Sequence, residues 1–171
     1  VIVGESTQLD IAISQNGRIG IFLDFIGKAN HPTKADLHAN PVFHLAKVMN
    51  FLQSFAQRVL DNRQGSFVVL EVSAGQKGVL TPPQRCSLTL SWWFSAQMNH
   101  DDAIDAFHSE FEAFARTNNI PFDIRFHRGA GSYAIKPNHP FVQTVKTVIE
   151  SVTGNTPAIA PFPASCDMYV F

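Results

Sequence analysis

Cysteine is scarce in this sequence, with only Cys86 and Cys166 among 171 residues. Two cysteines are too few for a disulfide framework, so we expect both to be reduced thiols inside folded structure. Long hydrophobic runs are also absent, since no stretch approaches the ~20 residues that a membrane-spanning helix needs. The first residues, Val1 to Glu5, lack the basic flank of a signal peptide. These absences argue against a disulfide-rich or membrane protein and predict a soluble, cytoplasmic one.

An excess of charge of one sign is missing as well. The 13 Lys and Arg against 14 Asp and Glu leave a formal net charge of −1, which creates no field that gathers nucleic acid. The expected strands do not alternate basic with aromatic residues either, so we expect no nucleic-acid partner. Hydrophobic residues, in contrast, make up 45% of the chain and include 15 Phe. This composition excludes a disordered chain and predicts a core in which phenylalanine dominates.

Both ends of the sequence are apolar, whereas domains usually end in polar residues. The chain begins without Met at Val1-Ile2-Val3 and ends at Tyr169-Val170-Phe171. Because an average domain has ~100–200 residues, a chain of this length holds one domain, or a small domain with a piece of another. We expect that both ends were cut from a longer chain.

Hydrophobic periodicity predicts four strands and two helices between residues 18 and 128. Apolar residues occur at every second position over 19–25, 88–94 and 122–127, and residues 67–72 are a continuous β-branched and aromatic run. Both patterns are typical of strands. Apolar residues occur at every third or fourth position after the capping residues Asn40-Pro41 and Asn99 to Asp102, which is typical of helices. The turn signal Asn16-Gly17 predicts a hairpin or a strand break before the first of these strands.

The order strand, helix, strand, strand, helix, strand is that of the ferredoxin-like fold. This is an α+β arrangement with an antiparallel sheet and both helices on one face. Beyond it, Gly129 to Ser132 is typical of a hinge, and a helix follows with Pro140 in its first turn and Gly154 at its end. We expect this helix, a short strand over 158–161 and a strand over 11–14 to form a separate mixed α/β unit.

Histidine and carboxylate residues are the candidates for chemistry. His31 follows Gly27-Lys28-Ala29-Asn30 in a loop that leaves a strand, where functional groups concentrate, although a solvated loop histidine is the alternative. Glu5 and Asp167 each follow a short apolar strand, where a carboxylate suits metal or ligand binding, with a helix cap or an ion pair as the alternative. The other histidines fit surface, core or capping positions. The sequence holds no complete zinc, phosphate or dinucleotide motif.

Four short motifs occur in order: Gly4-Glu5-Ser6-Thr7, Gly27 to His31, Asn40 before the first long helix, and Pro163 to Asp167. In this order they resemble the Gly-Glu-Pro-Thr, Gly-Lys-x-x-His, Asn-Ala and Gly-Thr-Ser-Asp motifs of a family of di-zinc amidohydrolases and metallopeptidases. That family contains acetylornithine deacetylase, succinyl-diaminopimelate desuccinylase, aminoacylase and glutamate carboxypeptidase. In it, a ferredoxin-like lid or dimerisation domain interrupts an α/β catalytic domain. The resemblance covers nearly the whole chain and implies a lid at 17–128, with catalytic-domain fragments at 1–16 and 129–171.

The resemblance also implies a function, that of a zinc-dependent hydrolase cleaving an amide bond of N-acyl amino acids or small peptides. It makes Glu5 a zinc ligand, and Asn40 and Asp167 substrate contacts. In a homodimer formed through the lid, His31 becomes the residue that reaches into the partner's active site and stabilises the oxyanion. The implied cofactor is a pair of zinc ions, or cobalt or manganese in their place.

The sequence departs from the family's pattern at three places. Ser6 replaces the usual Pro, and Gly78 stands where the family has Asn before Val-Ile-Pro. Ser91-Trp92-Trp93 stands where it has Asp-x-Arg, whose arginine clamps the substrate carboxylate. An indole in place of a guanidinium removes that contact. Either the substrate differs from a simple N-acyl amino acid, or Arg85 or Arg125 supplies the charge.

The family's other zinc ligands and its general base lie before the first of these motifs or beyond the last. We therefore expect this chain alone neither to hold the metal pair tightly nor to hydrolyse a substrate. An alternative without metal chemistry stays open, namely a stand-alone ferredoxin-like module for dimerisation or for binding a small ligand. Sequence beyond the ends separates the two, since the enzyme requires a His-x-Asp and a Glu-Glu pair upstream.

Overall fold

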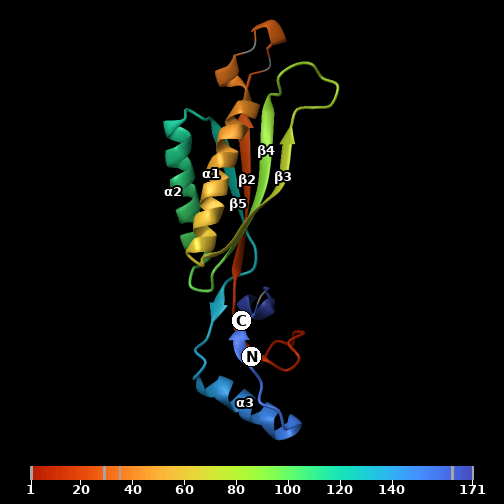
Figure 1. The fold of residues 1–171 in the computed structure, drawn as a ribbon, viewed down its shortest axis with the longest axis vertical. Coiled ribbons are helices and arrows are strands. Elements are labelled where there is room, and N and C mark those ends of the chain that lie inside the picture. The colour runs from red at the N-terminus through yellow and green to blue at the C-terminus, as the bar shows by residue number, and fades with distance from the viewer. Residues whose placement is uncertain (1, 29, 35, 163, 171) are drawn as a thin grey trace.

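The computed structural model describes residues 2–28, 30–34, 36–162 and 164–170. Two sheets lie one beyond the other along the long axis of the molecule (Figure 1). The expectations that concern Val1, Ala29, Pro163 and Phe171 fall outside the described residues. In chain order the elements are β1 (Ile11–Gln15), β2 (Gly17–Ile26), the 3-10 helices η1 (Pro32–Lys34) and η2 (Leu37–Ala39), α1 (Pro41–Asp61), β3 (Gly65–Ala74), β4 (Arg85–Phe94), α2 (His100–Thr117), β5 (Phe122–Arg128), β6 (Tyr133–Ala134), α3 (Pro140–Thr153), β7 (Ile159–Pro161) and the 3-10 helix η3 (Asp167–Val170).

The larger sheet is antiparallel, with the strand order β3-β4-β2-β5. β2 lies inside it and pairs with β4 from Gly17 to Ile26 and with β5 from Ile19 to Phe25. Helices α1 and α2 both cover one face of this sheet, and no helix of the described chain covers the other (Figure 1). The α+β, ferredoxin-like fold class expected from the sequence is confirmed.

The core lies between the two long helices and the larger sheet. Every second residue of β2 from Ile19 to Phe25 is fully buried, as the alternation predicted. The ring of Phe107, on α2, has its centroid 5.2 Å from that of Phe55 and 5.7 Å from that of Phe111. Aromatic pairs of this kind stabilise by about 0.5–1.5 kcal/mol beyond the area they bury. Within the described ranges, no helix is both long and apolar enough to cross a membrane.

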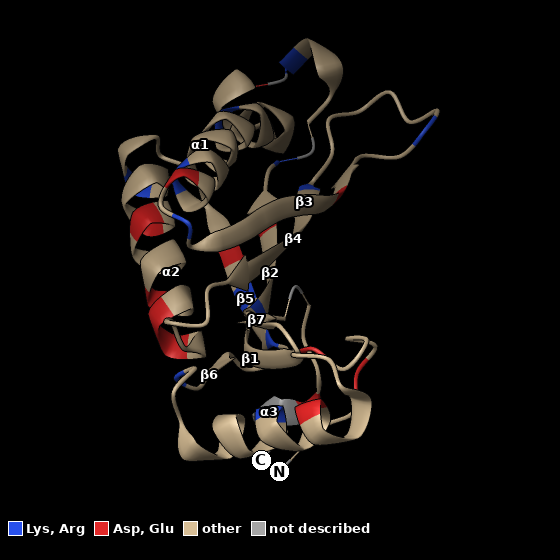
Figure 2. Cartoon of the chain, turned by 60° about the horizontal axis from the view of Figure 1, so that its bottom comes forward, with Lys and Arg blue, Asp and Glu red and all other residues tan. Residues whose placement is uncertain are grey.

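Short polar contacts fix where the two long helices begin. The Asn40 side chain caps α1 by accepting a hydrogen bond, 3.0 Å long, from the backbone N–H two residues on. Asn99 and Asp102 form a reciprocal capping box at the start of α2, with distances of 2.9 and 3.1 Å. Acidic residues gather on α2 (Figure 2), and an ion pair between Arg58 and Glu110 joins it to α1. Both predicted helix starts are confirmed.

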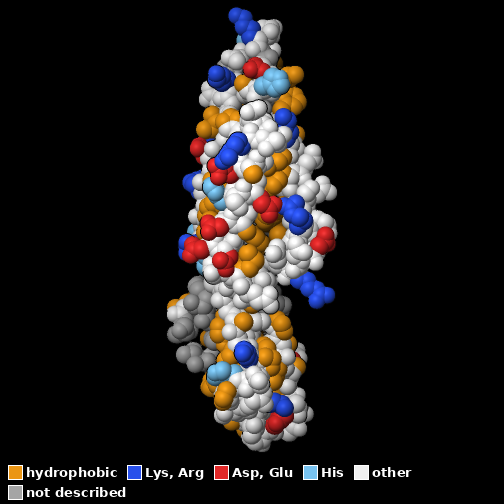
Figure 3. All heavy atoms as spheres, turned by 90° about the vertical axis from the view of Figure 1, so that its left-hand side faces the viewer, with side chains coloured by type: hydrophobic (Ala, Val, Ile, Leu, Met, Phe, Trp, Pro, Cys, Tyr) orange, Lys and Arg blue, Asp and Glu red, His pale blue; other side chains and the backbone are white. Residues whose placement is uncertain are grey.

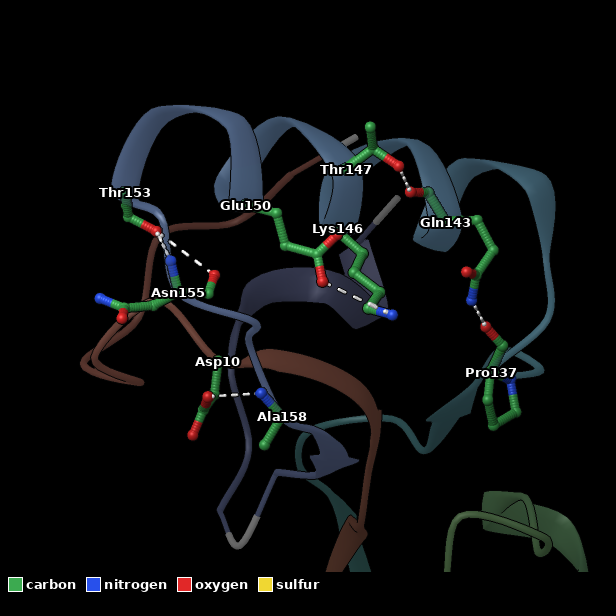
Figure 4. Close-up of polar contacts among 9 residues, drawn as sticks. All are labelled: Asp10, Pro137, Gln143, Lys146, Thr147, Glu150, Thr153, Asn155 and Ala158. Carbon is green, nitrogen blue, oxygen red and sulfur yellow. Dashed lines mark hydrogen bonds and ion pairs between the residues drawn. The ribbon is translucent and has the colours of Figure 1, made fainter.

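The second sheet is small and mixed, with the order β6-β1-β7. β1 pairs antiparallel with β6 and parallel with β7, and α3 packs against β1. The Asp10 carboxylate accepts a hydrogen bond from the backbone N–H of Ala158 at 2.8 Å, which ties the start of β1 to β7 (Figure 4). His139 caps α3, and Gly154 ends it in the left-handed region with a φ of 71°. The expected mixed α/β unit is therefore present.

The Asn16-Gly17 signal marks a strand break and not a hairpin. β1 ends at Gln15 and β2 starts at Gly17, yet the two strands belong to different sheets. Glycine is required at position 17 because a Cβ there would lie 2.2 Å from the Phe94 ring. The sequence did not predict β6 (Tyr133–Ala134), since two residues carry no periodicity.

The Phe107→Ala substitution is expected to lower the free energy of unfolding by about 3–5 kcal/mol, because it empties the centre of the aromatic core. Urea unfolding followed by circular dichroism measures this change. Phe141→Ala, at an α3 residue that is 42% exposed, is the control and is expected to cost less than about 1 kcal/mol. Equal costs for the two variants would contradict the assignment of the core.

Candidate functional site

Glu5 contributes to the wall of a cavity in the unit formed by β1, β6, β7 and α3, which we call the small unit. Residues of α3 form another part of this wall. The cavity measures about 260 Å³, and apolar side chains such as Ile11, Val145 and Ile149 make most of its wall. Glu5 is exposed, in a turn closed by a hydrogen bond from the Thr7 N–H to the Glu5 carbonyl at 2.8 Å. Its carboxylate is therefore accessible to a ligand in this cavity.

Gln15 connects the turn before Asp167 to the end of β1. Its buried side chain donates to the Gly131 carbonyl at 2.8 Å and accepts from the backbone N–H of Cys166 at 3.0 Å. Cys166 lines the same cavity as Glu5, and Asp167 is the next residue. The structure thus brings Glu5 and the Asp167 turn to one cavity. Sequence reasoning missed Gln15, because a single buried glutamine at a strand end leaves no periodic signal.

Two weakly acidic groups stay neutral around physiological pH. Both cysteines are free, and burial raises the pKa of the Cys86 thiol in the core of the larger unit. Burial also raises the pKa of Tyr133, which lines the cavity, and the nearby Cys166 raises it further. The acidic residues that line this cavity are Glu5 and Asp10.

His31 lies in the segment between β2 and α1, at the opposite end of the molecule (Figure 1). Its Nδ1 is 2.8 Å from the Thr33 Oγ1, which engages one ring nitrogen and leaves Nε2 for another partner. The segment is closed at its base, where the Lys28 N–H donates to the Ala39 carbonyl at 3.2 Å. Gly27 is required there because a Cβ would come within 2.6 Å of that carbonyl oxygen.

The predicted site residues fall into two groups separated by the length of β2. Glu5 and Asp167 lie with the small sheet, where β2 begins, whereas His31 and Asn40 follow the end of β2. A strand of ten residues spans roughly 33 Å, at ~3.3 Å per residue. A single chain therefore does not bring His31 and Glu5 together. Gly78, in the connection between β3 and β4, lies at the same end as the His31 segment (Figure 1).

The face of the larger sheet that carries no helix presents arginines stacked on aromatic rings. Arg18 of β2 lies over the Trp93 ring of β4, 5.4 Å from its centroid, and Arg125 of β5 lies over the Phe22 ring of β2 at 5.6 Å. Each pair joins residues that are directly opposite in register but distant in sequence. Inspection of single strands for alternating basic and aromatic residues could not find such pairs.

Asp24 lies on the same face and is only 5% exposed. It accepts hydrogen bonds from Ser87 at 2.5 Å and from Arg85 at 2.7 Å, and the Arg125 guanidinium is 3.7 Å away. Burial alone would raise the pKa of Asp24, but the hydrogen bonds from Ser87 and Arg85 and the charges of the two arginines outweigh it and lower the pKa. Arg85 and Arg125, which the sequence offered as alternatives for binding the substrate carboxylate, thus both interact with Asp24.

Arg18 has no carboxylate partner of this kind, because no ion pair among the described residues includes it. Its backbone is fixed by two hydrogen bonds, from the Arg18 N–H to the Ala130 carbonyl at 2.8 Å and from the Gly129 N–H to the Arg18 carbonyl at 2.9 Å. A Cβ on Gly129 would lie 2.8 Å from the Arg18 Nε, so glycine leaves the room that this side chain occupies. An exposed guanidinium without a carboxylate, at the end of β2 nearest the small sheet, is suited to bind an anion.

The described residues do not complete a metal site. Across the ranges that the structure covers, no three His, Cys, Asp or Glu side chains lie close enough to hold a metal ion. Catalytic zinc sites take three protein donors. The described residues therefore do not by themselves fit the zinc pair that the resemblance implies.

Comparison with known proteins finds likeness in structure and not in sequence. No protein-family model and no curated protein sequence matches the chain. Among solved structures, aminopeptidase PepT from Bacillus cereus matches with a TM-score of 0.70 and 13% identity, over 94% of this chain and 42% of that one. An M20 family metallo-carboxypeptidase from Sulfolobus solfataricus matches with a TM-score of 0.67 and 12% identity, over 95% and 49%. A hydantoinase/carbamoylase family amidase from Burkholderia phymatum matches with a TM-score of 0.65 and 14% identity, over 98% and 43%.

Nearly all of this chain is aligned in each match, while it spans less than half the length of each matched structure. The resemblance that the four short motifs indicated is thereby confirmed at the level of the fold. This chain has the fold of one part of the M20 family metallo-carboxypeptidase and of the aminopeptidase and amidase that share it.

Proposed function

We propose that this chain is the lid, with parts of the catalytic domain, of a metal-dependent hydrolase that cleaves amide bonds of N-acyl amino acids or small peptides. Residues 17–128 form the lid, and residues 1–16 and 129–171 belong to the catalytic domain. The fold shared with solved peptidases and amidases supports this proposal. The observation that carries it is the separation of Glu5 from His31 by the length of β2, which suits a site built from two copies.

Two copies contribute different residues to each such site. One copy supplies Glu5 as a metal ligand and Asp167 as a substrate contact at the cavity of the small unit. The other copy supplies His31, whose Nε2–H donates a hydrogen bond to the amide oxygen as negative charge develops on it. Asn40 enters with His31, and because its Oδ1 caps α1, its NH₂ group is the one available to substrate. The metal's other ligands lie outside these 171 residues.

The edge strand β3 is the surface through which we expect the two copies to meet. Among the described strands β3 pairs with β4 alone, so one side of it presents free backbone groups. Val68, Leu70 and Val72 are exposed on β3, and the exposed fraction of Leu70 is 63%. An exposed apolar edge is a template for pairing with another strand. Antiparallel pairing of β3 with its counterpart across a two-fold axis continues the sheet through both copies and gives the homodimer.

His31→Ala tests the role of the second copy. In the protein that includes the rest of the catalytic domain, this substitution is expected to lower kcat by about 10²–10³, because the developing oxyanion loses a donor. Metal content, measured by elemental analysis, is expected to stay unchanged. His108→Ala, at a histidine on α2, is the control. An unchanged kcat for hydrolysis of N-acyl amino acids would remove His31 from the mechanism.

Arg18 is the residue that we expect to hold the substrate carboxylate in place of the missing arginine at position 93. Arg18→Gln is expected to raise KM for an N-acyl amino acid by about 10- to 100-fold, since a hydrogen bond to a charged group stabilises by ~1.5–3 kcal/mol. The KM for the corresponding amino acid amide, which lacks the charge, is expected to change little. Arg63→Gln is the matched control, because Arg63 also forms no ion pair among the described residues. The same rise for acid and amide would place the carboxylate elsewhere.

A further inference from the structure

A second cavity lies on the larger unit, at the end that carries the His31 segment. It measures about 470 Å³, is open to solvent, and is bordered by η2, the first turns of α1 and the turn between α2 and β5. This volume is within the range of small-molecule sites. Its lining residues are Leu37, His38, Phe43, His44, Lys47, Thr117, Asn118 and Asn119. Imidazole, ammonium and amide donors therefore face the cavity, and none of the described residues that line it is acidic.

His44 is the buried polar group of this cavity. It is only 5% exposed and belongs to the otherwise apolar inner side of α1. Burial lowers the pKa of His44, and the charges of Lys47 and His38 lower it further, while a hydrogen bond with the His38 backbone acts in the opposite direction. The imidazole is thus held neutral by its surroundings, and a negative charge placed beside it would favour its ionised form.

The charged groups that face His44 are positive. η2 presents His38 and α1 presents Lys47, whereas the turn between α2 and β5 presents only neutral side chains. Lys47 takes part in none of the ion pairs among the described residues. Asp36 precedes η2, but its carboxylate caps that turn by accepting from the His38 N–H at 2.8 Å, and it does not line the cavity. At the upper end of the helix-bearing side, Figure 3 shows histidine and basic side chains beside hydrophobic ones, with an acidic side chain among them.

We propose that this cavity binds a small oxyanion, of the sulfate, phosphate or carboxylate type, between His38, His44 and Lys47. Hydrogen bonds from ionised donors to an oxyanion are shorter and stronger than those between neutral groups. The bound anion connects η2 to α1, so it holds the segment that carries His31 against the helix. This site lies apart from the Glu5 cavity, and its test does not depend on the proposed hydrolase activity.

Sulfate is the probe, because its charge stays constant over the pH range of the titration. We expect saturable shifts of the His38 and His44 ring signals in NMR spectra. Binding is expected to tighten several-fold as the pH falls from 8 to 6, because the anion favours the protonated ring of His44. Burial lowers the pKa of the unliganded ring, so its protonation is incomplete at pH 6 and the effect grows at lower pH. His44→Gln is expected to reduce this pH dependence, and Lys47→Gln to weaken binding several-fold at both pH values.

Two further measurements keep the proposal open to refutation. His127→Gln, at an exposed histidine outside the cavity, is the control and is expected to bind sulfate like the unaltered protein. Lys47 is exposed, so Lys47→Gln still tests the site if His44→Gln fails to fold. Acetate distinguishes a site for any oxyanion, at which His44 shifts with both probes, from one for tetrahedral anions alone. No saturable shift of His44 with either anion, or equal sulfate affinity with and without the Lys47 amine, would overturn the proposal.

Discussion

The pairing of β2 on both of its sides is the constraint on which the rest of the structure depends. β4 pairs with all ten residues of β2, and β5 pairs with seven of them, while its inner face is buried against the helices. A strand held in this way has a fixed length, and that length separates the His31 segment from Glu5. Gly17 begins this strand and Gly27 follows it, and at either position a Cβ would overlap neighbouring atoms. In the function that we propose, a site that uses both groups is therefore assembled from two copies.

On the face of the larger sheet that carries no helix, β2 contributes two charged residues with different roles. One is paired within the fold, and the other is oriented for binding a ligand. Asp24 is buried there and pairs with two arginines, so both guanidinium groups are held by contacts within the sheet. Arg18, nearer the small sheet, is supported by the Trp93 ring and by the backbone at Gly129, and it keeps its charge unpaired among the described residues. Support by an aromatic ring and backbone atoms orients a guanidinium without neutralising it.

Much of the fold could be predicted from the sequence, because an element that buries one side carries apolar residues at regular intervals. The alternation in β2 and the caps at Asn40 and Asn99 identified elements that the structure confirms. Features that arise between elements could not be predicted in this way, and they include the buried Gln15 and the Arg18–Trp93 pair. The order of the motifs singled out Glu5 and His31, but their separation is a property of the assembled sheet.

The most direct test of a site made from two copies mixes two inactive variants of the whole enzyme, Glu5→Gln and His31→Ala. In a mixed dimer, the site with the native Glu5 of one copy and the native His31 of the other is intact. Random exchange of subunits makes half of the dimers mixed, so about a quarter of the native activity is expected to return. If differently tagged subunits show that mixed dimers form but no activity returns, the account is contradicted.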